Sequence, residues 1–296
     1  MSKKRKTGTN KKKGSTKSGK SKTSSVSKKE DVKIDMRLME QMFGTSEHDF
    51  EGMMPVEQAQ QIIYSALEQD DRDDRIQLAL EALQLSLDCA DAYVILAEES
   101  ASDYQEAMAW YMLGVRAGER ALGEETFEED AGLFWGILET RPYMRARLGL
   151  AQCLWSIGQR EDAVTEYRVL LDLNPNDNQG VRYMLMAALL VLGLDKEAES
   201  LLNDYEDESS AMWAYASVLL SFRRSGDTEQ SRRQIEEAVK NNPFVSKYLI
   251  GKKKFPKQLP EFYSPGDESE AVECAYDQIE AWKNTDGAIK WLAENT

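Results

Sequence analysis

Few residues of this chain have side chains that could catalyse a reaction. Its 296 residues include one histidine, His48, and three cysteines, Cys89, Cys153 and Cys274. His48 stands in the polar stretch 46–49, where no motif arranges a serine, cysteine or carboxylate around it. We therefore interpret it as a surface histidine. The sequence predicts no catalytic residue, no cofactor and no small-molecule substrate, and hence a protein that is not an enzyme.

Metal and phosphate sites are also not expected. The cysteines are widely spaced, odd in number and placed on apolar helix faces, which is typical of small buried side chains in a reducing compartment. The acidic runs 70–74 and 124–130 lack the glycine-kinked spacing of a calcium loop, so we interpret them as solvated surface. Residues 14–21 are similar to the end of a phosphate-binding loop but have no preceding strand.

Positive and negative charges are separated along the chain. Residues 1–29 contain twelve Lys and Arg and no Asp or Glu, which leaves 25 basic and 52 acidic residues in the rest, a formal charge of −27. The basic segment has almost no apolar residues, so burial cannot offset an ordering entropy of roughly 1–2 kcal/mol per residue. The sequence predicts a disordered basic tail over residues 1–33.

The charge of this tail is compatible with several roles. It is a solubilising extension, a non-specific contact with RNA or ribosomes through phosphate neutralisation, or an attachment to another anionic surface. In a eukaryote, residues 3–6 also match a nuclear import signal. No aromatic residue stands among the lysines, so base stacking is not expected. The candidate polyanion-binding residues are Lys3, Lys4, Arg5, Lys6, Lys11, Lys12 and Lys13.

The elements that would position a binding site are helices. With 42% hydrophobic residues, 18 glycines and 7 prolines, the composition argues against a many-turned all-β protein. Gly158, Gly193 and Gly226 lie 35 and 33 residues apart, and each follows an apolar helix and opens a second one. Five positions after each glycine stands a small residue that lets two helices approach closely. This pattern predicts a helix-turn-helix repeat.

The repeat resembles the tetratricopeptide repeat. Gly158, Ala163 and Pro175 occupy the expected positions of one unit, although the usual leading Trp is absent from all three. The resemblance implies an all-α fold, a solenoid in which antiparallel helix pairs form a right-handed superhelix. The predicted organisation is a tail over 1–33, a short amphipathic helix and linker over 34–54, and a helical-repeat domain over 55–296. Its clearest repeats are 145–177, 180–210 and 212–243, with capping helices over 267–294.

Other segments lead to more local predictions. The helix in 34–54 docks on the folded body as a cap, or else it recognises another protein. Residues 119–141 depart from the period and predict an insertion with a partly exposed aromatic segment. Asp267 and Glu270 have the spacing of a capping box. The aromatic and large apolar residues expected to be buried by the final helix pair are Tyr276, Trp282, Ile289 and Trp291.

Two stretches extend the resemblance to a particular family. Residues 88–99, and the run from 242–249 through 266–271 to 281–288, are similar to signatures of the suppression-of-tumorigenicity-seven family. The likeness covers roughly residues 56–293. It implies a helical-repeat body and offers no catalytic residue. Animal members also have hydrophobic membrane segments that this sequence lacks, so their membrane location is not expected here.

A groove lined by the first helices of the repeats is the expected binding site. The inward positions Leu148, Gln152, Tyr183, Ala187, Ala216 and Leu220 do not form a Lys/Arg/Asn clamp for a carboxylate. The predicted groove is instead apolar and aromatic, and its candidate residues are Arg145, Trp155, Tyr183, Trp213 and Arg223.

The sequence therefore predicts a non-enzymatic scaffold that binds a peptide segment or helix of a protein partner. The alternative is an RNA- or ribosome-associated factor that uses the basic tail. No run of residues approaches the roughly 18 apolar residues of a membrane-spanning helix, and the N-terminus lacks the apolar segment of a signal peptide. We expect a soluble, unsecreted protein in the cytoplasm, or in the nucleus of a eukaryote.

Overall fold

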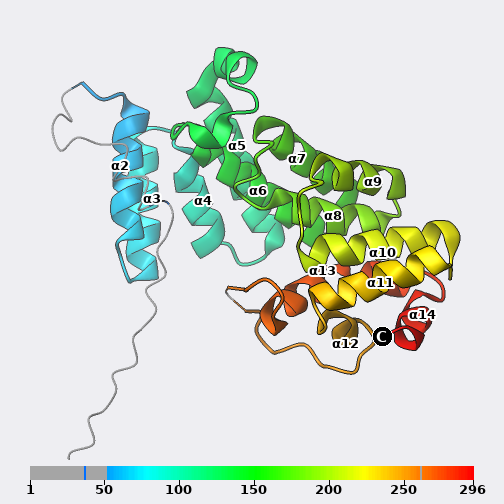
Figure 1. The fold of residues 1–296 in the computed structure, drawn as a ribbon. Coiled ribbons are helices and arrows are strands. Elements are labelled where there is room, and N and C mark those ends of the chain that lie inside the picture. The colour runs from blue at the N-terminus through cyan, green and yellow to red at the C-terminus, as the bar shows by residue number, and fades with distance from the viewer. Residues whose placement is uncertain (1–36, 38–51, 261) are drawn as a thin grey trace, which may run out of the picture. The chain divides into compact units, whose positions relative to one another are not determined.

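The computed structural model describes Arg37, residues 52–260 and residues 262–296. The chain divides into Met1–Ile34 and Asp35–Thr296, and every helix described below belongs to the second unit. The predicted tail with its candidate residues Lys3 to Lys13, the linker histidine His48 and residues 14–21 lie outside the described residues. The described residues form helices and no strand, which confirms the predicted all-α class (Figure 1).

The helices follow one another with short connections. In chain order they are α2 (Pro55–Leu67), α3 (Arg72–Leu85), α4 (Ala90–Glu99), α5 (Tyr104–Glu129), the 3-10 turn η1 (Phe134–Gly136), α6 (Arg141–Ser156), α7 (Arg160–Leu173), α8 (Val181–Leu192), α9 (Asp195–Asp204), α10 (Ala211–Ser225), α11 (Glu229–Asn241), α12 (Val245–Leu249), α13 (Glu268–Asn284) and α14 (Ala288–Glu294). Most consecutive helices pack as neighbours, and α6/α7, α8/α9 and α10/α11 are the pairs expected from the glycine period.

The three repeated glycines make the turns within these pairs. Gly158, Gly193 and Gly226 have φ angles of 87°, 69° and 66°, a region that residues with a Cβ rarely adopt. The small residues five positions later, Ala163 and Ala198 among them, are fully buried where the paired helices meet. The helix-turn-helix prediction is confirmed at all three glycines, because both its turn chemistry and its small contact residue are in place.

Replacing Ala163 with tryptophan should destabilise the body by about 1–3 kcal/mol or more. Ala163 is fully buried in α7, so an indole at this position must displace the packed neighbouring helix. Thermal unfolding of the full chain measures the loss. Thr165→Trp is the control, because Thr165 is exposed on the same helix and its replacement should leave the midpoint nearly unchanged. Equal midpoints for the two variants would contradict the proposed helix contact.

The segment predicted as an insertion with partly exposed aromatic residues agrees with the prediction only in part. Helix α5 continues to Glu129 and is kinked at Gly123, where φ is 73° and ψ is 165°. Phe134 is fully buried and packs against Phe127 and Tyr143, with ring centroids 5.1 and 6.2 Å apart. The aromatic segment therefore adds to the core between α5 and α6, and only Phe127 and Trp135 stay partly exposed.

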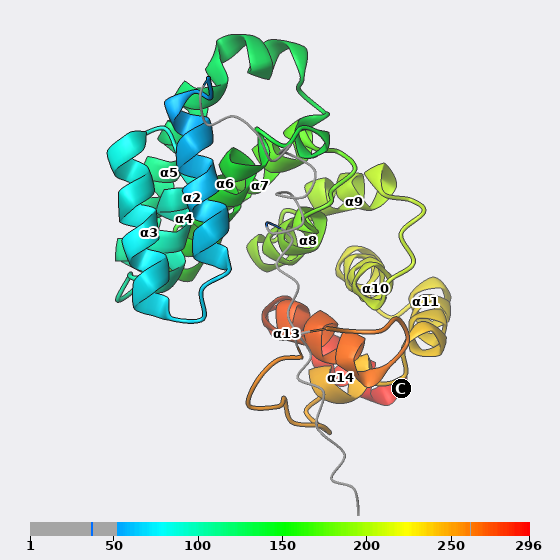
Figure 2. The same cartoon turned by 90° about the vertical axis from the view of Figure 1, so that its left-hand side faces the viewer.

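The C-terminal helices also differ in part from the prediction. Trp282 and Trp291 are buried as expected, but Tyr276 is 53% exposed, so the prediction of its burial is wrong. Tyr276 lies against Phe255 of the preceding loop, with ring centroids 5.8 Å apart. Helix α13 packs against α8 and α10 (Figure 2) and also against α12, and these contacts leave Tyr276 exposed.

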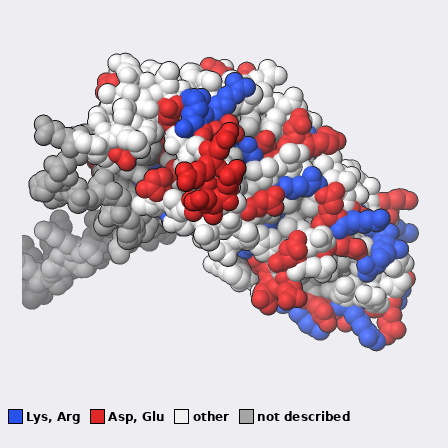
Figure 3. Space-filling view, turned by 90° about the horizontal axis from the view of Figure 1, so that it is seen from above, with Lys and Arg blue, Asp and Glu red and all other residues white. Residues whose placement is uncertain are grey.

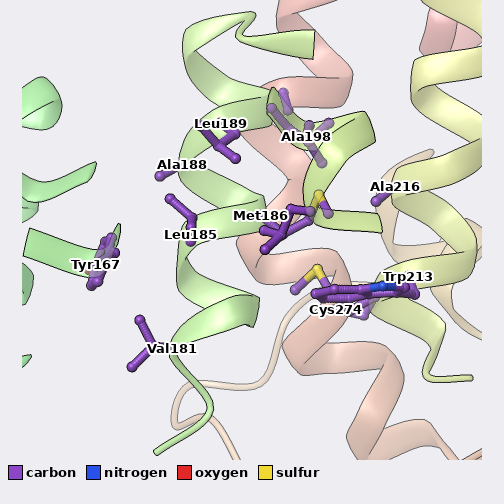
Figure 4. Close-up of a cluster of buried hydrophobic side chains, with 14 of the residues drawn as sticks. Tyr167, Val181, Leu185, Met186, Ala188, Leu189, Ala198, Trp213, Ala216 and Cys274 are labelled. Carbon is purple, nitrogen blue, oxygen red and sulfur yellow. The ribbon is translucent and has the colours of Figure 1, made fainter. Parts of the chain in front are cut away.

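The core continues without interruption from the repeated helices into α13. Figure 4 shows Met186 of α8, Trp213 of α10 and Cys274 of α13 close together, and all three are buried. Helix α13 is thus an integral part of the body, and it lies beside the helices that were expected to line a groove.

Candidate partner-binding face

The candidate site is the face formed by α6, α8 and α10, which we call the first-helix face. The inward positions predicted for it become steadily less accessible along the chain. Gln152 of α6 is exposed and Ala187 of α8 is half-buried, whereas Ala216 and Leu220 of α10 are buried. The three repeats therefore do not present one open groove.

Helix α13 covers the first-helix face at α10. Met212 and Arg223 share one side of α10 with Ala216 and Leu220, since all four follow a spacing of three or four residues. Both bind α13: the Gln278 side chain donates to the Met212 carbonyl oxygen at 2.8 Å, and Arg223 donates to the Ala281 carbonyl oxygen at 3.2 Å.

Arg223, predicted as a groove residue, joins four helices. Its Nη2 donates to the Leu190 carbonyl oxygen at 2.8 Å, and its Nη1 contacts the Asp195 carboxylate at 2.6 Å. Its Nε donates to Thr285 Oγ1 at 2.8 Å. The guanidinium thereby links the end of α8, the start of α9 and the end of α13 to α10. These hydrogen bonds join Arg223 to α13, so the residue stabilises the packing of α13 on α10.

Glu270 fastens the other end of α13 to α10. Its buried carboxylate, 4% exposed, accepts hydrogen bonds from the Ala211 N–H at 2.9 Å, the Gly266 N–H at 2.7 Å and Asn242 Nδ2 at 3.0 Å. Asp267 caps α13 as predicted, by accepting from the N–H groups of residues 269 and 270. The predicted capping box would have Glu270 accept from the N-terminal residue of its own helix. Its carboxylate instead accepts from the Ala211 N–H and so caps α10, a contact that no local sequence pattern indicates.

Replacing Glu270 with alanine should lower the free energy of unfolding by about 1–3 kcal/mol. The substitution leaves the buried Ala211 N–H without its acceptor, which costs about 1–3 kcal/mol. It also removes the acceptor of the exposed Gly266 N–H and one of the two acceptors of Asn242 Nδ2. Urea unfolding measures the total, and hydrogen exchange of the Ala211 amide reports the loss of the cap directly. The control is Glu236→Ala on the exposed side of α11. Unchanged exchange at Ala211 would contradict the capping role.

Tyr183 and Trp213, also predicted as groove residues, belong to an aromatic cluster. Their rings pack edge to face with centroids 5.5 Å apart, and Tyr205 packs against Trp213 at 6.2 Å. Trp213 is only 5% exposed, and its Nε1 has no acceptor among the described residues. Arg182 lies over the Tyr183 ring at 4.3 Å. Tyr183 remains half-buried, so it is the accessible member of the pair.

A shared carboxylate orders this cluster. Glu208 accepts hydrogen bonds from Tyr183 Oη at 2.6 Å and Arg182 Nη2 at 2.7 Å, and Arg182 also pairs with Asp177 at 2.9 Å. Burial raises the pKa of Glu208, but the hydrogen bonds from Tyr183 and Arg182 outweigh it and lower the pKa below its ordinary value. Asp177 in turn caps α8 through the Val181 N–H at 2.6 Å.

Arg145, the first predicted groove residue, forms a buried ion pair. Its Nε and Nη2 donate to the two carboxylate oxygens of Asp91 at 2.9 and 2.6 Å, and Gln60 adds a third hydrogen bond at 2.9 Å. Asp91 is 0% exposed. Burial raises its pKa, yet the charge and hydrogen bonds of Arg145 lower it overall. The nearby Arg37 pairs with Glu98 at 3.3 Å, which attaches that residue to α4.

Trp155, the remaining candidate, lies at the edge of the first-helix face. Arg160 lies over its ring at 4.8 Å and pairs with Glu280 of α13 at 2.7 Å. Trp155 is half-buried, and the neighbouring Gln152 is exposed. Of the five predicted groove residues, Trp155 and Tyr183 are therefore the two with accessible aromatic surface.

An acidic stripe runs along α13 toward the α6/α7 pair. Glu273, Asp277 and Glu280 follow a helical spacing, and the ion pair between Glu280 and Arg160 shows which pair the stripe faces. Burial and the neighbouring Glu273 charge raise the pKa of Asp277 to about 7. Burial also raises the pKa of Glu273. Neither of these two carboxylates has an ion-pair partner in the described part of the chain.

Two cysteine thiols of the body are held in their protonated form by burial. Burial raises the pKa of the Cys89 thiol to about 12 and that of Cys153 to about 11, so both stay protonated at neutral pH. Within residues 52–260 and 262–296, no group of three His, Cys, Asp or Glu side chains is placed to hold a metal ion. Among the helices of these same residues, none combines the length and apolar character needed to cross a membrane.

Known proteins resemble nearly the whole of this body. A family model described as ST7 protein matches residues 35–295. The chain is 28% identical over 277 residues to the Suppressor of tumorigenicity 7 protein-like of Rattus norvegicus, a match that covers 85% of this chain and 48% of the relative. It is 30% identical over 249 residues to the protein of that name from Gallus gallus, covering 74% and 43%. The chain spans about half the length of these relatives, and neither is named for an enzymatic activity.

Proposed function

The chain belongs to the ST7 family, and we propose that it is a non-enzymatic scaffold whose first-helix face binds a helical segment of a partner protein. The observation that supports the proposal is α13, a helix of 17 residues packed along α8 and α10. A face that binds a helix of its own chain has the chemistry to bind a second helix beside it.

The partner helix would lie on α6 and α8, next to the acidic stripe of α13. Gln152 and Trp155 offer polar and aromatic surface there, and Ala187 leaves room for close approach. Glu273 and Asp277 would be neutralised by lysine or arginine. We therefore expect a helix with one apolar side and one basic side.

A pull-down with matched lysine substitutions tests this placement. Gln152→Lys puts a bulky cation on the proposed contact surface, and Asn203→Lys makes the same change at an exposed position of α9. We expect the proteins captured by the full chain, identified by mass spectrometry, to be lost with Gln152→Lys and kept with Asn203→Lys. Capture that is equal for both variants contradicts binding at the first-helix face.

The separation of charge favours one alternative function, association with RNA or ribosomes through the tail. Twelve basic residues precede a body of charge −27, so polyanion binding would depend on residues 1–29. A variant with these twelve residues changed to glutamine, compared with and without nuclease, separates the two functions. Loss of capture in this variant and after nuclease supports the RNA function, whereas unchanged capture supports the scaffold.

A further inference from the structure

A second site lies between the second helices of two neighbouring pairs, away from the first-helix face. It is an open pocket of about 470 Å³ between the end of α5, the start of α6 and the end of α7. Phe127, Tyr143, Val169 and Leu173 form its apolar floor. The Phe127 ring packs against Tyr143 at 5.1 Å between centroids, so the floor is held in place by aromatic contacts.

The kink in α5 gives this pocket its outer wall. Gly123 lines the pocket, and its φ of 73° redirects the last turns of the helix past α6 and α7. A Cβ at Gly123 would meet no atom within 4 Å, so the glycine serves the backbone conformation and not close packing. The kink thus places the side chains of residues 124–128 around an apolar hollow.

Arg147 contributes a fixed cation to the wall of the pocket. Arg147 lines the pocket, and its Nε finds no hydrogen-bond partner among the described residues. Its Nη1 lies 3.2 Å from Glu166, and its guanidinium lies over the Tyr143 ring at 5.3 Å, so the side chain is held in one position.

Carboxylates surround the pocket. Glu119, Glu124 and Glu128 line it and are exposed, against the one cation Arg147. The adjoining Glu125 and Glu129 are exposed as well. Figure 3 looks onto the side where the end of α5 projects in Figure 1, and it shows Asp and Glu side chains gathered in one patch. The rim therefore attracts positive charge, while the floor requires an apolar group.

We propose that this pocket binds an extended segment of a partner protein in which one large apolar side chain is flanked by lysine or arginine. The apolar side chain packs on Phe127 and Val169, and the basic side chains pair with Glu124 and Glu128. The segment is not the basic tail of this chain, because residues 1–29 contain no aromatic residue and little else that is apolar.

Fluorescence anisotropy with the full chain tests the site. The probe is a labelled nonapeptide with a central phenylalanine between lysines, arginines and serines, and its partner probe has alanine in place of the phenylalanine. We expect the alanine probe to bind about tenfold more weakly, because it loses the buried ring. The double variant Glu124→Gln/Glu128→Gln should weaken the phenylalanine probe about fivefold.

The matched control removes the same charge elsewhere. Glu236→Gln/Glu237→Gln changes two exposed carboxylates of α11, and its affinity for the phenylalanine probe should equal that of the unchanged chain. Equal weakening by both double variants would show attraction by bulk charge alone and overturn the site. Equal affinity of the two probes, or no binding by either, also overturns it. A peptide of residues 1–29 that binds more tightly than the phenylalanine probe and responds to Glu124→Gln/Glu128→Gln would show that the tail is the occupant.

Discussion

Replacing Arg145 with alanine will lower the free energy of unfolding by about 3–5 kcal/mol, because it leaves the carboxylate of Asp91 buried without its cation. Asp91 is 0% exposed, and Arg145 supplies two of the three side-chain hydrogen bonds that it accepts within the described part of the chain. Urea unfolding of the full chain at neutral pH measures the change. The ion pair joins α4 to α6, so the loss should also appear as faster hydrogen exchange in both helices.

Two further variants separate burial from charge. Arg224→Ala breaks an exposed ion pair with Glu199 and should cost less than about 1 kcal/mol. The double variant Asp91→Ala/Arg145→Ala should recover part of the loss, since it buries no unpaired charge. If Arg145→Ala costs no more than Arg224→Ala, the Asp91 pair does not stabilise the fold as inferred.

Replacing Asp277 with asparagine will stabilise the protein at pH 8, by on the order of 3 kcal/mol after allowance for solvent screening. Burial and the Glu273 charge raise the folded-state pKa of Asp277 from 3.8 to about 7. The pKa of Asp277 is higher in the folded protein than in the unfolded chain. Protonated Asp277 therefore makes its full contribution to stability only below pH 3.8. This contribution is lost as the pH rises toward 7. Asparagine does not titrate, so the variant avoids this loss.

Urea unfolding at several pH values from 4 to 8 measures this linkage. The two proteins should have similar stability near pH 4, diverge as the pH rises from 4 to 7, and keep a constant difference above pH 7. Asp286→Asn, an exposed residue before α14, is the control and should follow the unchanged chain at every pH. A difference between Asp277→Asn and the unchanged chain that is independent of pH would contradict a raised pKa. A basic helix bound beside α13 should suppress the divergence, because it would neutralise Asp277 and Glu273.

Much of the fold could be predicted because its signals are local. Gly158, Gly193 and Gly226 need positive φ angles, and a small residue five positions later marks a close helix contact. Asp267 as the cap of α13 is likewise a property of neighbouring residues. Residues 119–141 were predicted as an insertion, but helix α5 extends into them as far as Glu129, with a kink at Gly123.

The candidate site was less predictable, because the residue types on one helix do not show which other helix will pack against them. Trp213 and Arg223 have the residue types of a binding surface, yet one is buried in an aromatic cluster and the other binds α13. Residues of these types are found both in cores and at interfaces, and only their neighbours decide between the two. Arg147 and the pocket beside it left no sequence signal, since the lining comes from three separate helices.

The sequence by itself determined that the described body is built of paired helices, and it separated a basic N-terminal segment from an acidic remainder. Both properties follow from short-range chemistry: the conformational freedom of glycine, the period of apolar residues and the count of charges. Only the tertiary structure decided which surfaces stay open. Glu270 meets Ala211 across 59 residues, and Gln278 meets Met212 across 66. Such contacts leave no period in the sequence, because each depends on where the last helices return after the repeats are folded.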